Sequence, residues 1–95
     1  LQPPHGVYAV RARVNGAEYG GVANLGVRPT VEGDAGELLL ETHLFGQPGD
    51  IYGQEMEVVP VRFLRPEAKF PSLEELKNQL ALDAAQAAEV LRRDK

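Results

Sequence analysis

The chain has 95 residues, a formal net charge of −4 at neutral pH and no cysteine. This length fits one small domain over residues 1–95, which can bury roughly 60–65% of its surface. The acidic balance argues against a binder of nucleic-acid backbone, and the lack of cysteine excludes disulfides and thiolate metal sites and suits a cytoplasmic protein. No apolar stretch approaches the ~18 residues of a membrane span, so we expect no membrane partner.

Four strands are predicted before the C-terminal third of the chain. Residues 6–14 are predicted to form a strand, with Tyr8, Val10, Ala12 and Val14 on one face and Arg11 and Arg13 on the other. The Asn15-Gly16 dipeptide then predicts a tight hairpin turn, which returns the chain as a second strand over residues 17–26. A third strand is expected at 37–45 and a fourth at 54–64. The pattern indicates an antiparallel β domain.

The third strand is apolar on both faces in its first half, where Leu38, Leu39 and Leu40 follow one another. A sheet with one wet face would alternate instead. Something is therefore expected to cover both sides of this strand.

One amphipathic helix is predicted from Ser72 to about Arg92. Ser72 and Glu75 have the spacing of a capping box, and Arg92 and Arg93 suit the negative end of the helix dipole. Apolar residues recur at helical spacing at Leu73, Leu76, Leu80, Ala84, Ala87 and Leu91. This helix is the natural candidate to cover the second face of the third strand.

Glu41 is the first candidate for chemistry. It stands inside an apolar strand, where a carboxylate is costly unless it is paired or has a task. His43 follows on the same face, two residues on. Spacing alone favours a glutamate on a solvated face, whereas the apolar surroundings favour a partly desolvated base that is still ionised at pH 7. Both histidines, His5 and His43, are interpreted as structural or surface residues, and the sequence contains no phosphate-loop or zinc motif.

At this point the sequence resembles the riboflavin kinase domain of bacterial bifunctional riboflavin kinase/FAD synthetases. The resemblance spans essentially the whole chain and rests on five ordered blocks. They are Pro4-His5-Gly6-Val7-Tyr8-Ala9-Val10, Gly21-Val22-Ala23-Asn24-Leu25-Gly26-Val27-Arg28-Pro29-Thr30, Leu40-Glu41-Thr42-His43-Leu44, Gly49-Asp50-Ile51-Tyr52-Gly53 and Leu64-Arg65-Pro66-Glu67-Ala68-Lys69-Phe70.

The resemblance implies a six-stranded antiparallel Greek-key β-barrel with one C-terminal helix. It implies transfer of the γ-phosphate of ATP to the 5′-hydroxyl of riboflavin, with Mg²⁺, to give FMN. It also allows a preceding FAD synthetase (adenylyltransferase) domain as a partner. The site residues that it implies are Glu41 as the catalytic base, Asp50 and Tyr52 beside the nucleotide, and Arg65, Glu67 and Phe70 near the flavin.

The sequence also departs from the family pattern. Family members carry an earlier glycine-rich segment with a Pro-Thr-Ala-Asn motif, which helps to hold Mg²⁺ and the phosphates, and this sequence has no such motif. Arg28-Pro29-Thr30 is a different element. We therefore expect an incomplete barrel that, as these 95 residues alone, is weak or inactive. A non-catalytic small β-barrel that binds a flavin or a protein stays open as the alternative.

Overall fold

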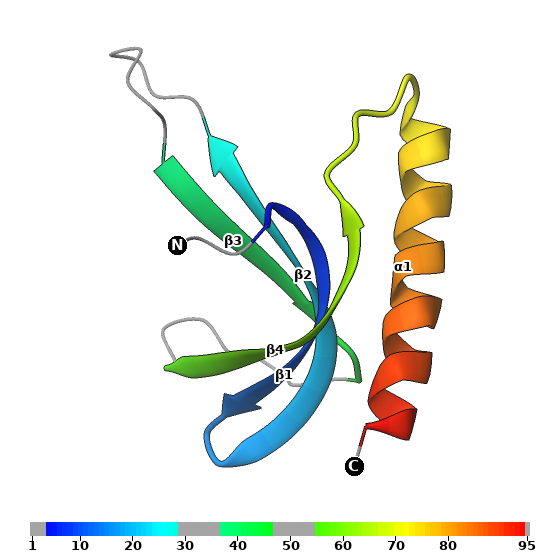
Figure 1. Cartoon of the computed structure of the whole chain (residues 1–95). Helices are drawn as coiled ribbons and strands as arrows, with labels where there is room; N and C mark the ends of the chain where they lie inside the picture. Colours follow the sequence, from blue (N-terminus) through cyan, green and yellow to red (C-terminus); the bar gives the residue numbers. More distant parts are fainter. Residues whose placement is uncertain (1–3, 29–36, 47–54, 95) are drawn as a thin grey trace.

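An open, curved antiparallel sheet and one long helix make up the computed structural model, which describes residues 4–28, 37–46 and 55–94 (Figure 1). The elements are β1 (Gly6–Val14), β2 (Ala17–Arg28), β3 (Glu37–Leu44), β4 (Met56–Pro66) and α1 (Leu73–Arg93). All four predicted strands are present. Their ends differ from the predicted ends by no more than two residues.

The β1–β2 hairpin forms where the sequence predicts it. Asn15 and Gly16 have φ angles of 53° and 81°, the left-handed conformations that a two-residue turn of this kind requires. The turn sets the register, with Val14 opposite Ala17 and Ala9 opposite Val22.

Strand β1 lies inside the sheet, whose order is β3-β2-β1-β4. Strands β3 and β4 are therefore the two outer strands among the described residues, and the sheet does not close into a barrel. Pro60 favours an edge strand or a bulge, because proline cannot donate a hydrogen bond to a neighbouring strand, and β4 shows both features among the described residues. Its pairing with β1 skips Val61 and Leu64, and such extra residues bend a strand and increase its twist.

Helix α1 packs across one face of the sheet, against β1, β2 and β4. The centre of this contact is Ala9, Ala87 and Leu91, and the two bulge residues Val61 and Leu64 pack beside it. Gly20 in β2 lets the helix come this close, because a Cβ at this position would lie 2.7 Å from Leu91 Cδ1 and would force the Leu91 side chain to move.

The expectation that the helix covers the second face of β3 was wrong. The helix crosses the middle of the sheet, and β3 lies at its edge. Among the side chains described for this segment, residues 40–45, Phe45 just after β3 reaches the packed cluster, while Leu40 is 49% exposed on the other face. That other face is an apolar hollow of about 260 Å³.

The two ends of the helix are held by different side chains. At the C-terminal end, the Arg11 guanidinium donates to the carbonyl oxygens of Leu91 (3.0 Å) and Asp94 (2.6 Å). At the N-terminal end, the Ser72 hydroxyl oxygen accepts a hydrogen bond from the Glu75 backbone N–H at 3.2 Å. This contact is one half of the predicted capping box.

Loss of the helix cap has a defined expected effect. Ser72→Ala leaves the Glu75 N–H without its acceptor and is expected to lower the free energy of unfolding by about 1 kcal/mol. Urea denaturation followed by circular dichroism measures this change as a lower midpoint with an unaltered slope. Ser72→Asp keeps an acceptor at the same place and is expected to retain stability. An unchanged midpoint in Ser72→Ala would show that the cap contributes nothing.

Candidate functional site

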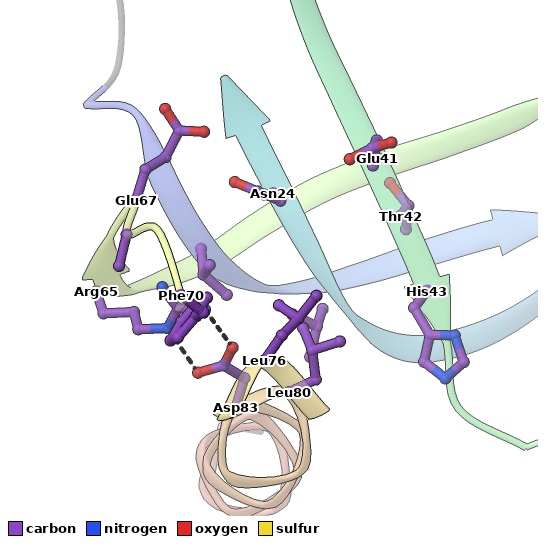
Figure 2. A pocket seen from close by; sticks show the side chains of 13 residues that line it. Asn24, Glu41, Thr42, His43, Arg65, Glu67, Phe70, Leu76, Leu80 and Asp83 are labelled. Atoms are coloured by element: carbon purple, nitrogen blue, oxygen red, sulfur yellow. Dashed lines mark hydrogen bonds and ion pairs between the residues drawn. The ribbon is translucent and has the colours of Figure 1, made fainter. Parts of the chain in front are cut away.

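A cleft of about 270 Å³ lies between the helix side of the sheet, the start of α1 and the connector between β4 and α1 (Figure 2). Its polar lining is Asn24, Glu41, Thr42, His43, Arg65, Glu67 and Asp83, and its apolar lining is Val7, Val22, Ala68, Phe70, Leu76 and Leu80. The volume is close to the lower end of small-molecule sites, about 300 Å³.

The sheet register brings polar groups to one wall of the cleft. Asn24 lies opposite Glu41, and Val22 lies opposite His43. Directly opposed residues in an antiparallel pair point to the same face, so Asn24, Glu41 and His43 share the helix side of the sheet. The expectation that His43 stands beside Glu41 is met, and the His43 ring also makes an edge contact with Phe45, with 6.4 Å between ring centroids.

Glu41 is exposed in the structure, not partly desolvated as the apolar run had suggested. Strand β3 is an outer strand, and successive side chains of a strand point to opposite faces. The apolar neighbour Leu40 therefore lines the hollow on the far side. Glu41 faces the cleft, where its carboxylate is open to a ligand.

The opposite wall is built on a buried ion pair. Arg65 Nε and Nη2 donate to the two carboxylate oxygens of Asp83 at 2.8 and 2.7 Å, and Gln79 donates to the same carboxylate at 2.9 Å. Burial raises the pKa of Asp83, but the hydrogen bonds from Arg65 and Gln79 and the attraction of Arg65 outweigh it, so this pKa is lowered overall. The hydrogen bond to Asp83 raises the pKa of Arg65. Both groups are therefore charged at neutral pH.

The connector after β4 supplies the remaining wall. The Arg65 guanidinium carbon lies 5.7 Å from the centroid of the Phe70 ring, a cation–π distance. The Glu67 carboxylate lies against the backbone of β2 at Gly26, where a Cβ would collide with it. A residue without a side chain at position 26 thus lets Glu67 fold over the sheet.

This close approach gives a testable prediction. Gly26→Ala is expected to push the flexible Glu67 carboxylate away from the sheet and to weaken ligand binding in the cleft, with little loss of stability. Gly21→Ala is the matched control, because its Cβ would meet the His43 carbonyl oxygen and the Leu44 backbone instead. It is expected to destabilise the β2–β3 pair. Urea denaturation of both variants, with a titration of the riboflavin that the sequence resemblance implies as ligand, separates the two effects; equal stability losses would contradict this account.

Four of the six residues predicted for the site lie around this one cleft: Glu41, Arg65, Glu67 and Phe70. The other two, Asp50 and Tyr52, fall outside the described residues. His5 is not among the residues that line the cleft.

No motif or spacing in the sequence had pointed to a role for Asn24, Gln79 or Asp83. For Asp83 a signal existed: Leu76, Leu80, Asp83 and Ala87 follow helical spacing toward the sheet, so a carboxylate occupies a core-facing position. The apolar stripe had been assigned to Ala84 instead. In the structure Asp83 is 1% exposed, and Ala84 is half-buried.

The part of the chain that the structure describes contains no group of three or more acidic or histidine side chains that could hold a metal ion. The described residues therefore provide no all-protein site for Mg²⁺. The described helix is also not apolar enough over a sufficient length to cross a membrane.

An open four-stranded sheet with one helix, and a cleft that combines a carboxylate with an apolar wall, are typical of a domain that binds a small ligand. The family model for riboflavin kinase (Flavokinase) matches residues 1–91. The chain belongs to the riboflavin kinase family.

Curated relatives agree with this assignment. The bifunctional riboflavin kinase/FMN adenylyltransferase of Pseudomonas fluorescens is 47% identical over 85 residues, which cover 90% of this chain and 27% of that protein. Its counterpart in Haemophilus influenzae is 46% identical over 88 residues, or 92% of this chain and 28% of the relative. The chain thus spans only 27% of the first relative and 28% of the second.

The fold also resembles a crystal structure described as a macrolide-efflux protein from Streptococcus pneumoniae. The TM-score is 0.79 at 31% sequence identity, over 98% of this chain and 29% of that one.

Proposed function

We propose that this chain forms the flavin-binding, base-carrying part of a riboflavin kinase, which transfers the γ-phosphoryl group of ATP to the 5′-hydroxyl of riboflavin. The observation that carries the proposal is the cleft, in which Glu41 faces an apolar wall. Family membership supplies the reaction class. Mg²⁺ as the companion of ATP and a cytoplasmic location belong to the same proposal.

The two walls of the cleft suit the two halves of riboflavin. Phe70, Leu76 and Leu80 offer apolar surface for the flat isoalloxazine ring. Asn24, Glu41 and Glu67 offer hydrogen-bonding groups for the hydroxyls of the ribityl chain. A ligand placed this way presents its polyol to the sheet and its ring system to the helix.

In this arrangement Glu41 accepts the proton of the 5′-hydroxyl. The hydroxyl oxygen forms the new bond to the γ-phosphorus, the bond from that phosphorus to the bridging oxygen breaks, and ADP leaves. In phosphoryl transfer the base chiefly orients the nucleophile, because charge is spread over the transferred group. The roles of Asp50 and Tyr52 beside the nucleotide stay predictions.

The names of the relatives suggest a covalent partner as well. Both relatives are described as bifunctional with an FMN adenylyltransferase activity. We therefore propose an adenylyltransferase domain as a partner, which would convert the FMN product to FAD.

Two measurements test the function. Riboflavin fluorescence is titrated with the chain, and FMN formation with ATP and Mg²⁺ is followed by chromatography. The assays use the 95 residues alone and the same residues preceded by a family segment that carries the Pro-Thr-Ala-Asn motif. We expect saturable quenching in both forms, weak FMN formation in the first and strong formation in the second.

The outcomes separate the competing functions. Binding without FMN formation in the extended form would favour a non-catalytic flavin-binding module. If the chain showed neither riboflavin binding nor FMN formation, riboflavin would be excluded as its ligand. Full activity of the 95 residues alone would show that the motif is dispensable.

A further inference from the structure

Asp83 is a charged side chain in a place where an apolar one would pack. It lies on the sheet-facing side of α1 and is 1% exposed. Both of its carboxylate oxygens are used: Arg65 binds them in a two-pronged contact, and Gln79, one helical turn earlier, holds one of them. The acid is therefore fixed from its own helix and from the end of β4.

Arg65 connects Asp83 to the wall of the cleft. Arg65 also donates from Nη1 to the Pro66 carbonyl oxygen at 3.1 Å. Each of the three guanidinium nitrogens therefore donates a hydrogen bond within the protein. This fixed plane stands over the Phe70 ring. Figure 2 shows the ion pair next to Phe70 at the same end of the cleft.

Stability alone gives no reason for an ion pair here. A buried pair loses hydration, and apolar residues of similar volume are often as stabilising or more so. The pair does fix the orientation of the Arg65 side chain, because a guanidinium that binds a carboxylate through two hydrogen bonds has one favoured plane.

We propose that Asp83, held by Gln79, is a positioning residue that fixes Arg65 and through it Phe70, so that the Phe70 ring is a preorganised stacking surface for the flat ring of the ligand. The identity of that ligand as a flavin rests on the proposed function. A surface that is already ordered before binding loses less conformational entropy when the ligand arrives.

The first test needs no ligand. In nuclear magnetic resonance spectra of the ligand-free chain, Asp83→Asn and Gln79→Ala are expected to shift the Arg65 Nε–H signal and the Phe70 ring signals together. Glu89→Gln is the control, because Glu89 pairs with Arg92 and Arg93 on the exposed side of the helix. If Asp83→Asn fails to fold, the milder Gln79→Ala carries the same test. Phe70 ring signals that stay in place while the Arg65 signal moves would overturn the proposal.

The second test measures coupling through riboflavin affinity. Asp83→Asn and Phe70→Leu are each expected to weaken riboflavin binding about tenfold, which lies within the range of coupled pairs. The double variant is expected to bind no more weakly than Phe70→Leu alone, because Asp83 acts through Phe70. Additive losses would show that Asp83 acts independently and would overturn the proposal; so would unchanged affinity in folded Asp83→Asn.

The two tests also separate this proposal from the proposed function. If the unaltered chain does not bind riboflavin, the proposed function is wrong. The ligand-free spectra still decide whether Asp83 positions Phe70.

Discussion

Replacement of Glu41 by glutamine is expected to lower FMN formation by about 10²–10⁴-fold, the usual contribution of a general base. Glutamine keeps the length and the hydrogen-bonding oxygen of the side chain, but it cannot take up the hydroxyl proton. Because Glu41 is exposed at the cleft and its carboxylate is not part of the packed core, the fold and the riboflavin affinity should be nearly unchanged. Steady-state kinetics in the form of the protein that makes FMN, with a parallel riboflavin titration, measures both quantities.

A matched control separates this effect from a loss of negative charge on the sheet. Glu57 is also an exposed strand glutamate, on β4, and it does not line the cleft. Glu57→Gln is expected to leave turnover unaltered. Turnover close to that of the unaltered protein in Glu41→Gln would exclude Glu41 as the base. A large loss of riboflavin affinity with unchanged turnover would assign it to binding instead.

Local sequence signals predicted most of the fold. The Asn15-Gly16 turn and the Ser72 cap each depend on residues close in sequence, and each is found where expected. The covering of β3 was predicted wrongly, because it depends on strand order. Three consecutive leucines indicate apolar surroundings, but they do not indicate which element supplies them.

In the candidate site too, local sequence signals identified individual residues, whereas the contacts between distant residues came only from the structure. The family blocks pointed to Glu41, Arg65, Glu67 and Phe70, which come from β3, β4 and the connector and meet only through the sheet register and the path of the connector. Asn24 lies next to Glu41 because of the register between β2 and β3, which the sequence does not reveal. Asp83 pairs with a residue 18 positions away, and no local pattern identifies such a partner.

The second large effect is expected from Asp83→Ala, which should lower the free energy of unfolding by about 3–5 kcal/mol. The substitution leaves the Arg65 guanidinium, whose side chain is 20% exposed, without its counter-charge. Small domains have about 5–15 kcal/mol of stability in total, so the variant would be close to unfolding. Urea denaturation measures the change.

The double variant Arg65→Met with Asp83→Leu is the informative partner of this experiment. It removes both charges and keeps apolar volume between β4 and α1, so it should be neutral or more stable by up to about 4 kcal/mol. If it were as unstable as Asp83→Ala, the ion pair itself would stabilise the fold and the positioning argument would lose its premise. A stable double variant with weakened riboflavin binding would instead separate folding from ligand positioning.

The pH dependence of stability is a second, independent test of the Arg65–Asp83 ion pair. The pKa of Asp83 is lower in the folded chain than its usual value, because the hydrogen bonds and charge of Arg65, with Gln79, outweigh its burial. An acid of this kind stabilises the fold above its unfolded pKa of about 4 and loses that contribution as the pH falls toward its folded pKa. The unaltered chain should therefore lose more stability below about pH 4 than the double variant does. Parallel curves for the two proteins in this range would show that protonation of Asp83 does not contribute to acid unfolding.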